Sequence, residues 1–389
     1  MKIRTHKLHD EQFGNDWNER IESRWLYDDF KHGQSDRQQR WRKGWISFDC
    51  ALYEPAGDRI YLGITSFAAD IFKAFDRKSG KFIDLGYDRI ADPYDAKFHR
   101  SLENGPDGCL YGAVALLHCV DHFNDAPGGA IVRYDPQSGS IAKLAVLQEH
   151  VYIQSIALDQ KRQMIYAMML APEKLCSFNL RTGQIKDYGL IGVGIYGLAQ
   201  GENLCLDDQG GCWGSWQLTR AWQSPTDSDY NRLCKIDPKE DRLIYYQKGL
   251  PRPDGRRGTT KVEGLFNLGD GKLYASGGNG SLFRIDPAGA DSEYLSTPIA
   301  DRPSRLTSLV VGKDGLAYGV VGKAGNCELL RFDFKNSRHE LVGGRIKNSE
   351  GEPLWQVHQI VMADDGTLYA CENDVPHRSS YLWEISDVF

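Results

Sequence analysis

The chain repeats one short pattern of apolar and polar positions along its length. In most repeats a tight polar turn, such as Asp107-Gly108-Cys109 or Asp365-Gly366-Thr367, is followed by an apolar run that carries an aromatic residue. Turns of this composition between apolar runs are typical of paired antiparallel strands. The seven aromatic residues, at intervals of 50, 55, 47, 61, 44 and 51 residues, are Tyr61, Tyr111, Tyr166, Trp213, Tyr274, Tyr318 and Tyr369.

A second motif follows most of these aromatic residues and marks another turn. Examples are Arg133-Tyr134-Asp135-Pro136 and Arg284-Ile285-Asp286-Pro287. Each repeat therefore offers about four strands, and a repeat of roughly 40–50 residues with four strands has the size of a propeller blade. We predict an all-β chain that forms a seven-bladed β-propeller.

The domain organisation follows from where the blades begin. We predict a single domain, 1–389, with the seven blades in residues 46–389. Only about three strands remain for the last blade after Val357, so residues 1–9, and Lys2–Leu8 in particular, are expected to supply its outer strand and close the ring. Residues 10–45 are a long polar connection, either a surface wrap or a lid over one mouth of the channel.

Composition narrows the class of protein. A chain of 389 residues with 41% apolar residues can bury one large core. No apolar stretch approaches the roughly 18 residues of a membrane span, and Met1-Lys2-Ile3-Arg4 is not followed by an apolar signal core. We expect a cytoplasmic protein, or a secreted or periplasmic one if a signal was removed. The nine cysteines include no Cys-x-x-Cys pair, which favours buried thiols over a zinc site.

Propeller geometry brings three chemically useful side chains toward one mouth. The start of a blade's first strand and the end of its second strand meet at the same face. His99 stands at the first of these positions in blade two and His118 at the second, while Tyr152 starts the first strand of blade three. Two imidazoles and a phenol can transfer protons in a cleft. His358 starts the first strand of blade seven, where it is either a satisfied core histidine or a substrate contact.

Charge indicates an anionic partner. The formal net charge is −6, yet the loops predicted at the mouth near His99 are basic. Cations gathered around one opening of an acidic protein suit an anionic substrate, unless neighbouring carboxylates balance them. The sequence has neither a Lys/Arg-dominated domain nor a base-reading motif, so we do not expect nucleic acid as the partner. We expect no membrane partner either. The predicted substrate-binding residues are Arg100, His122, Arg220, Trp216, Lys261, Arg305, His358 and Arg378.

Several short sequence segments of the chain resemble a known family. They look like the seven-bladed propeller polysaccharide lyases, namely the ulvan lyases and the related lyases that release rhamnose linked to glucuronate. The resemblance spans nearly all the blades through short motifs. The segments are Lys97-Phe98-His99-Arg100-Ser101, Ala126-Pro127-Gly128-Gly129 with Arg133-Tyr134-Asp135-Pro136, Tyr152-Ile153-Gln154-Ser155-Ile156, and Glu372-Asn373-Asp374 with Arg378-Ser379-Ser380-Tyr381-Leu382-Trp383-Glu384.

The resemblance implies a set of site residues. In that family two histidines and a tyrosine surround the uronic acid, and an arginine neutralises its carboxylate. The histidines correspond to His99 and His118, with His122 as a competing candidate for the second, and the tyrosine corresponds to Tyr152. The position of the arginine falls near Met168 and Met169, so a cation from another loop would have to replace it. The candidates are Lys174, Arg220 and Arg232.

The chemistry implied is β-elimination at a uronic acid. The enzyme removes the proton at C5 of glucuronate or iduronate and expels the oxygen at C4. Neutralising the carboxylate stabilises the enolate-like transition state by several kcal/mol in a dehydrated cleft. We assign His118 and Tyr152 to proton transfer and His99 to carboxylate recognition, although Tyr152 could serve as both base and acid. No cofactor is required; a structural or carboxylate-neutralising divalent metal, with ligands not identified, stays open.

Two other classes of function stay open. One is a metal-dependent sugar lactonase or hydrolase on a propeller, which needs several carboxylate or amide ligands. The other is a carbohydrate- or protein-binding propeller without chemistry. The candidate metal ligands for the first are Glu263, Asn203, Asp49 and Glu372.

Overall fold

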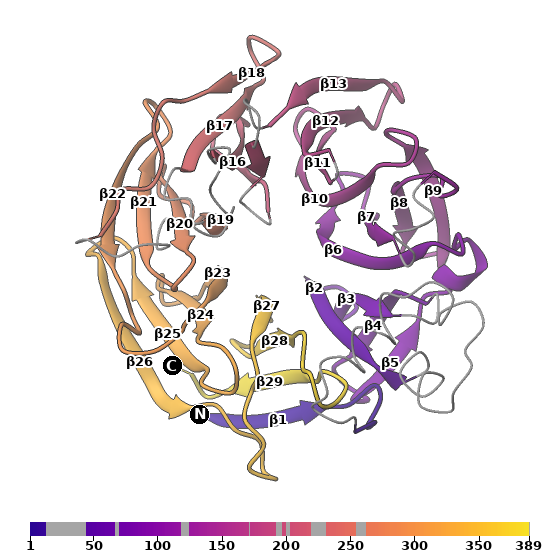
Figure 1. Ribbon diagram of the computed structural model, residues 1–389. Helices are drawn as coiled ribbons and strands as arrows, with labels where there is room; N and C mark the ends of the chain where they lie inside the picture. Colours follow the sequence, from indigo (N-terminus) through magenta and orange to yellow (C-terminus); the bar gives the residue numbers. More distant parts are fainter. Residues whose placement is uncertain are drawn as a thin grey trace. The chain divides into compact units, whose positions relative to one another are not determined.

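The computed structural model describes residues 1–12, 44–66, 70–117, 124–170, 172–191, 197–199, 203–218, 231–253 and 262–388. Its elements are the strands β1 to β29 and the short 3-10 helix η1 (Tyr87–Arg89), so the predicted all-β class is confirmed (Figure 1). Within these ranges no helix is long and apolar enough to cross a membrane. Most of the predicted polar connection, residues 13–43, lies outside the described residues.

The chain divides into two compact units, which we describe separately. Unit 1 comprises Met1–Gln154 and Asn348–Val388. One of its sheets has the order β1-β29-β28-β27, and the other contains the first two predicted blades, joined by a single pair between β3 and β6. Its strands are β1 (Lys2–His6), β2 (Ile46–Glu54), β3 (Arg59–Ser66), β4 (Phe72–Asp76), β5 (Lys81–Asp84), β6 (Asp95–Asn104), β7 (Leu110–Leu117), β8 (Ala130–Asp135), β9 (Ser140–Val146), β27 (Val357–Met362), β28 (Leu368–Glu372) and β29 (Leu382–Ser386).

Unit 2 comprises Ser155–Lys347, and its boundary with unit 1 falls inside β10. Four sheets contain its strands, each antiparallel and each corresponding to one predicted blade. They are β10 (Tyr152–Asp159), β11 (Met164–Leu170), β12 (Lys174–Asn179) and β13 (Ile185–Leu190); β14 (Gly197–Ala199), β15 (Cys205–Leu206), β16 (Cys212–Leu218), β17 (Asn231–Asp237) and β18 (Arg242–Tyr245); β19 (Val262–Asn267), β20 (Leu273–Gly277), β21 (Leu282–Asp286) and β22 (Asp291–Ser296); and β23 (Leu306–Val311), β24 (Ala317–Val321), β25 (Glu328–Asp333) and β26 (Arg338–Arg345).

The N-terminal strand completes the last sheet, as the sequence predicted. β1 pairs antiparallel with β29 from Lys2 opposite Ser386 to His6 opposite Leu382, and the two strands lie side by side in Figure 1. A side-chain contact reinforces the pairing, because Nε2 of His6 lies 2.8 Å from Oε2 of Glu384. The first and last strands of the described chain are therefore neighbours in one sheet.

The repeated aromatic residues are fixed by the turns that precede them. In the turn before β24, one carboxylate oxygen of Asp314 accepts the backbone N–H of Leu316 at 3.1 Å, and the other accepts the hydroxyl of Tyr318 at 2.6 Å. Asp270 binds Tyr274 in the same way at 2.7 Å. Because the carboxylate stabilises the turn and the buried phenol at once, the Asp-to-Tyr spacing of the repeat has a direct structural cause.

The core of each unit is aromatic and aliphatic. In unit 1, Phe72 contacts Phe98 edge-on with ring centroids 5.3 Å apart, and Tyr134 packs against Phe72 at 5.5 Å. The cysteines found in the described residues are all buried thiols. Burial raises the pKa of Cys50 and of Cys234 to about 12, so both thiols are protonated near neutral pH and act as small apolar side chains.

Candidate functional site

The first strands of the sheets in unit 1 carry β-bulges at corresponding places. In β2 the pairing passes from Phe48 opposite Ile64 to Cys50 opposite Gly63, which leaves Asp49 as an extra residue. In β27 the extra residue is His358, between Val357 and Gln359. A bulge bends its strand and re-aims the side chain of the extra residue, and bulges are common beside active sites.

The bulge in β6 is larger and contains the first predicted catalytic histidine. Phe98 pairs with Val114 and Leu102 pairs with Gly112, so three residues of β6, from His99 to Ser101, face Ala113 alone. Arg100 has φ 41°, a left-handed backbone conformation that costs free energy for a residue with a side chain. The surrounding sheet thus holds His99 and Arg100 in a strained segment.

The bulge brings His99 into contact with His358. Their Nε2 atoms are 3.0 Å apart, and the rings are tilted by 53° with centroids 4.4 Å apart. Nδ1 of His99 lies 2.8 Å from the carbonyl oxygen of Gln154, and Nδ1 of His358 lies 2.7 Å from the carbonyl oxygen of Asp49. Both imidazoles are almost fully buried, so these contacts hold them in one orientation.

A buried carboxylate and a lysine stand beside this histidine pair. One oxygen of Asp49 accepts the hydroxyl of Thr65 at 2.5 Å, and the other lies 3.1 Å from Nζ of Lys97. The same oxygen is 3.9 Å from Nδ1 of His358. The group formed by Asp49, Lys97, His99 and His358, which we call the bulge cluster, thus combines side chains from β2, β6 and β27.

Tyr152 is buried in the core of unit 1 rather than in the bulge cluster. Its hydroxyl is fully buried and forms no regular hydrogen bond with the described residues, although it has a weak interaction with the backbone of Gly128. Burial, followed by the nearby carboxylates of Asp95 and Asp92, raises the pKa of Tyr152 far above its ordinary value. The phenol is therefore protonated near neutral pH, so it holds a proton to donate and does not act as a base in this state.

Two predicted proton-transfer candidates cannot be placed. His118 and His122 lie outside the described residues. The structure therefore brings His99 together with His358, and it places Tyr152 in the same unit without a hydrogen bond from its hydroxyl to His99. The predicted grouping of His99, His118 and Tyr152 stays a prediction.

Arg378, a predicted substrate contact, is held inside unit 1. Its guanidinium binds both carboxylate oxygens of Glu372, at 2.7 and 2.9 Å, and stacks over the ring of Tyr381 at 3.8 Å. Burial of the side chain would lower the pKa of Arg378, but the ion pair with Glu372 stabilises the charged guanidinium and raises this pKa overall. These contacts describe a structural ion pair, and a substrate contact for Arg378 stays a prediction.

The remaining predicted substrate-binding residues belong to unit 2 or lie outside the described residues. Nε of Arg305 lies 3.0 Å from Oε2 of Glu263, the extra residue of the bulge in β19. Trp216 is buried on β16. Arg220 and Lys261 lie outside the described residues.

The position expected for the family arginine is apolar. Met168 and Met169 on β11 are both buried, and neither can bind a carboxylate. Of the possible replacements, Lys174 forms an ion pair with Asp187, and Arg232 donates to the carbonyl oxygen of Asn231 at 2.8 Å. No replacement for the arginine is therefore identified among these side chains.

The candidate metal ligands are occupied by other partners. Glu372 binds Arg378, and Glu263 binds Arg305. Asn203 exchanges two hydrogen bonds with the backbone of Leu265, and Asp49 contacts Thr65 and Lys97. Across the part of the chain that the structure describes, no three His, Cys, Asp or Glu side chains are grouped closely enough to hold a metal ion. The described residues thus do not fit a metal site, and we derive no chemistry through one.

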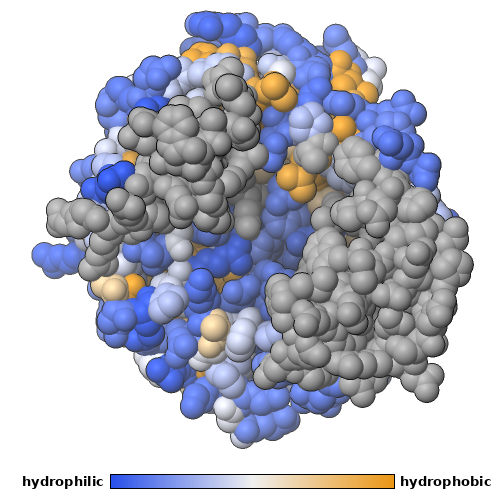
Figure 2. Space-filling model, viewed as in Figure 1, coloured by the Kyte–Doolittle hydropathy of each residue, from blue (hydrophilic) through white to orange (hydrophobic). Residues whose placement is uncertain are grey.

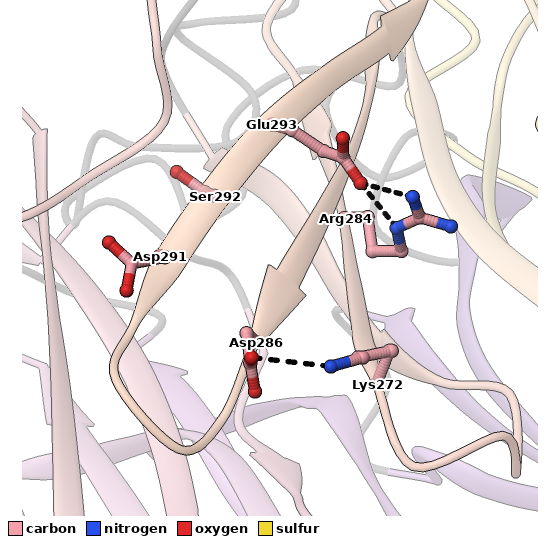
Figure 3. Close-up of a pocket in the computed structure, with 6 residues that line it drawn as sticks. All are labelled: Lys272, Arg284, Asp286, Asp291, Ser292 and Glu293. Atoms are coloured by element: carbon pink, nitrogen blue, oxygen red, sulfur yellow. Dashed lines mark hydrogen bonds and ion pairs between the residues drawn. The ribbon is translucent and has the colours of Figure 1, made fainter.

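A surface pocket of about 520 Å³ lies over β21 and β22 in unit 2 (Figure 3). Its charged side chains pair with one another, Arg284 with Glu293 and Lys272 with Asp286 at 3.3 Å. It contains none of the predicted site residues. On the face shown in Figure 2 the described surface is mainly hydrophilic with scattered hydrophobic spots, which is ordinary for a protein surface.

The direct contact between the two histidines was not predicted, although the sequence contains a signal for it. Asp49 and His99 each stand 12 positions before a repeat aromatic, and His358 stands 11 positions before Tyr369. Glu263 stands 11 positions before Tyr274. A polar residue at this place in the first strand coincides with the bulge, so the repeat itself marks the positions that carry the cluster.

Comparisons with known proteins show the fold. No protein-family model and no curated protein sequence matches the chain. Among solved structures, a catalytically inactive virginiamycin B lyase from Staphylococcus aureus with quinupristin is 12% identical, with 87% of this chain and 94% of that chain covered and a TM-score of 0.58. The WD40 repeats of RRP9 are 9% identical, with 98% and 99% covered and a TM-score of 0.58.

A third similar structure is the extracellular domain of the putative hybrid two component system BT4673 from B. thetaiotaomicron. It is 10% identical, has a TM-score of 0.56 and covers 86% of this chain, while the chain spans 38% of its length. Together with the four-stranded antiparallel sheets, these similarities show that the protein has a β-propeller fold. Identities near 10% carry no information on activity, so function is argued from the site.

Proposed function

We propose that the protein is a carbon–oxygen lyase that cleaves an oligosaccharide or polysaccharide at a uronic acid by β-elimination. The observation that carries the proposal is the pairing of two unusual features on neighbouring segments. His99 is held in a strained bulge within a cluster that contains more basic groups than acidic ones. Tyr152 keeps a buried hydroxyl that forms no regular hydrogen bond with the described residues.

A buried polar atom without a partner is unusual and calls for an explanation, because its desolvation costs roughly 1–3 kcal/mol. A hydroxyl that donates to a bound substrate would recover that cost only when the substrate is present. In the proposed reaction Tyr152 protonates the oxygen that leaves C4. This role agrees with a pKa that burial and Asp95 raise.

The remaining roles are assigned from the resemblance to polysaccharide lyases. His118 takes the proton from C5, the C4–O4 bond breaks, and a double bond forms between C4 and C5, conjugated with the carboxylate. His99 with its basic neighbours stabilises the negative charge that develops on the carboxylate. The proton held by the base then returns to Tyr152, which restores the starting state. A propeller of similar fold carries the name of a lyase, virginiamycin B lyase, so the fold is compatible with this class.

Access is restricted in the described structure. His99 and Tyr152 are each 3% exposed, so a substrate reaches either side chain only by displacing atoms that cover it. We expect a short oligosaccharide with a terminal or near-terminal uronate to do so more easily than a long polymer. This size preference agrees with an enzyme that acts on oligosaccharides.

The test is incubation with ulvan and with glucuronate–rhamnose oligosaccharides while ultraviolet absorbance is followed, since only elimination creates the conjugated double bond. Tyr152→Phe and His99→Gln should each lower turnover by at least about 100-fold. Tyr134→Phe, in the same buried core, is the matched control and should leave turnover unchanged. Product without the chromophore would indicate a hydrolase or lactonase, binding without product would indicate a binding propeller, and either result would overturn the proposal.

A further inference from the structure

The protons on the two clustered histidines can be located from their partners. A carbonyl oxygen only accepts hydrogen bonds. Because Nδ1 of His99 faces the carbonyl of Gln154 at 2.8 Å and Nδ1 of His358 faces the carbonyl of Asp49 at 2.7 Å, both δ nitrogens must carry a proton. A neutral imidazole has only one such proton, so each neutral ring would have a bare lone pair at Nε2.

Two bare lone pairs cannot face each other at the distance observed. The Nε2 atoms are 3.0 Å apart, which is a hydrogen-bond distance and requires one donor. With both δ positions already protonated, the donor must be an additional proton on one Nε2. We infer that His99 and His358 share this proton, so that the pair carries three protons on four ring nitrogens and a charge of +1.

One carboxylate compensates the positive charge of the buried pair, while the other charged side chains described beside it are positive. The carboxylate of Asp49 on β2 lies 3.9 Å from Nδ1 of His358 and supplies one negative charge. Lys97 on β6 binds that same carboxylate, so these four residues together carry a net charge of +1. Arg100 on the bulge adds another cation. Glu372, at the end of β28, and Arg378, in the segment between β28 and β29, neutralise each other.

The shared proton assigns a role to His358. For its catalytic consequence this inference rests on the proposed function. His99 has no free lone pair while it shares the proton, so it cannot accept the proton from C5. It acts instead as a fixed positive charge, and His358 is the positioning residue that maintains it. A cation of this kind can supply the positive charge that the resemblance assigns to an arginine.

The direct test uses the intact protein without substrate. Histidine labelled with 15N is observed by NMR, and the His358→Gln and His99→Gln variants assign the signals. At neutral pH we expect protonated δ nitrogens on both rings and one low-field proton coupled to both ε nitrogens. Two neutral rings with unprotonated ε nitrogens would overturn the inference. So would a stoichiometric metal found by elemental analysis, with the coupled proton visible only after chelation.

Kinetics give a second, separable readout. The glutamine amide in His358→Gln can still donate to Nε2 of His99 but carries no charge. We expect turnover to fall about 100-fold. The wild-type activity should also decline with rising pH, over the same pH range in which NMR shows that the shared proton is lost. The His358→Gln variant should not show this decline. An intact NMR signature in a protein without lyase activity would reject the proposed function while keeping the shared proton.

Discussion

Glu372 accepts four hydrogen bonds although its side chain is completely buried. Two come from the guanidinium of Arg378 and two from the backbone N–H groups of Trp355 and Tyr381. An ionised carboxylate inside a protein is tolerated only when its oxygens are paired in this way. The arrangement connects the end of β28 to the residues before β27 and to the segment between β28 and β29.

Removing the cation should therefore be costly. We predict that Arg378→Met lowers the free energy of unfolding by about 3–5 kcal/mol, because it leaves the buried charge of Glu372 without a partner. Urea unfolding followed by circular dichroism measures this change. Arg331→Met is the matched control, since its exposed pair with Glu340 on β26 should contribute less than about 1 kcal/mol. Equal losses in both variants would contradict the assignment.

Removing the hydroxyl of Tyr152 should not destabilise the protein, in contrast to removing the guanidinium of Arg378. Because this hydroxyl forms no regular hydrogen bond with the described residues, Tyr152→Phe should leave the free energy of unfolding unchanged within about 1 kcal/mol or raise it. Thermal unfolding of the two proteins provides the measurement. A clear loss of stability would mean that the hydroxyl has a structural partner, and its proposed role as an acid would lose its support.

In the turns before the second strands of the sheets, the coupling between the aspartate and the tyrosine that it binds can be tested. Asp270 binds both the backbone of its own turn and the hydroxyl of Tyr274. We predict that Asp270→Ala costs about 1–2 kcal/mol, and that Tyr274→Phe adds little in the Asp270→Ala background because both changes remove one shared hydrogen bond. A double-mutant cycle by urea unfolding measures the coupling. Additive losses would show that the two side chains act independently.

Contacts within one turn could be predicted from the sequence, whereas contacts between distant strands could not. The Asp-to-Tyr contacts join residues four positions apart, so the repeat that contains them was visible in the chain and led to the fold. The contact between His99 and His358 joins residues 259 positions apart. It depends on the register shift in each strand, and that shift is set by the partner strand rather than by local composition. The cluster positions were therefore recognisable, but their contacts were not.

At the scale of the whole molecule, the pairing of β1 with β29 makes a prediction about pH. The hydrogen bond from His6 lowers the pKa of Glu384, whose ordinary value is about 4.5. A lowered pKa stabilises the folded state above the ordinary value, and this stabilisation is lost as pH falls through the lowered one. His6→Ala should therefore reduce stability at neutral pH, and its difference from wild type should shrink in acid.

Urea unfolding at a series of pH values measures that difference. Lys2→Ala is the control on the same strand, because Lys2 and Asp387 are exposed and their ion pair should contribute little at any pH. A constant difference between His6→Ala and wild type down to strongly acidic pH would contradict the role of Glu384.

The same pairing has a consequence for how the protein is made. Lys2 is synthesised before its partner Ser386, which follows 384 residues later. At about 5–20 residues per second the first strand waits roughly 20–80 s for its neighbour. Until then the last sheet lacks one edge, and the nascent chain exposes unpaired backbone that other chains can bind. The strand that is translated first of the pair is thus among the last segments to reach its native place, and chaperone protection should matter most until Ser386 has been synthesised.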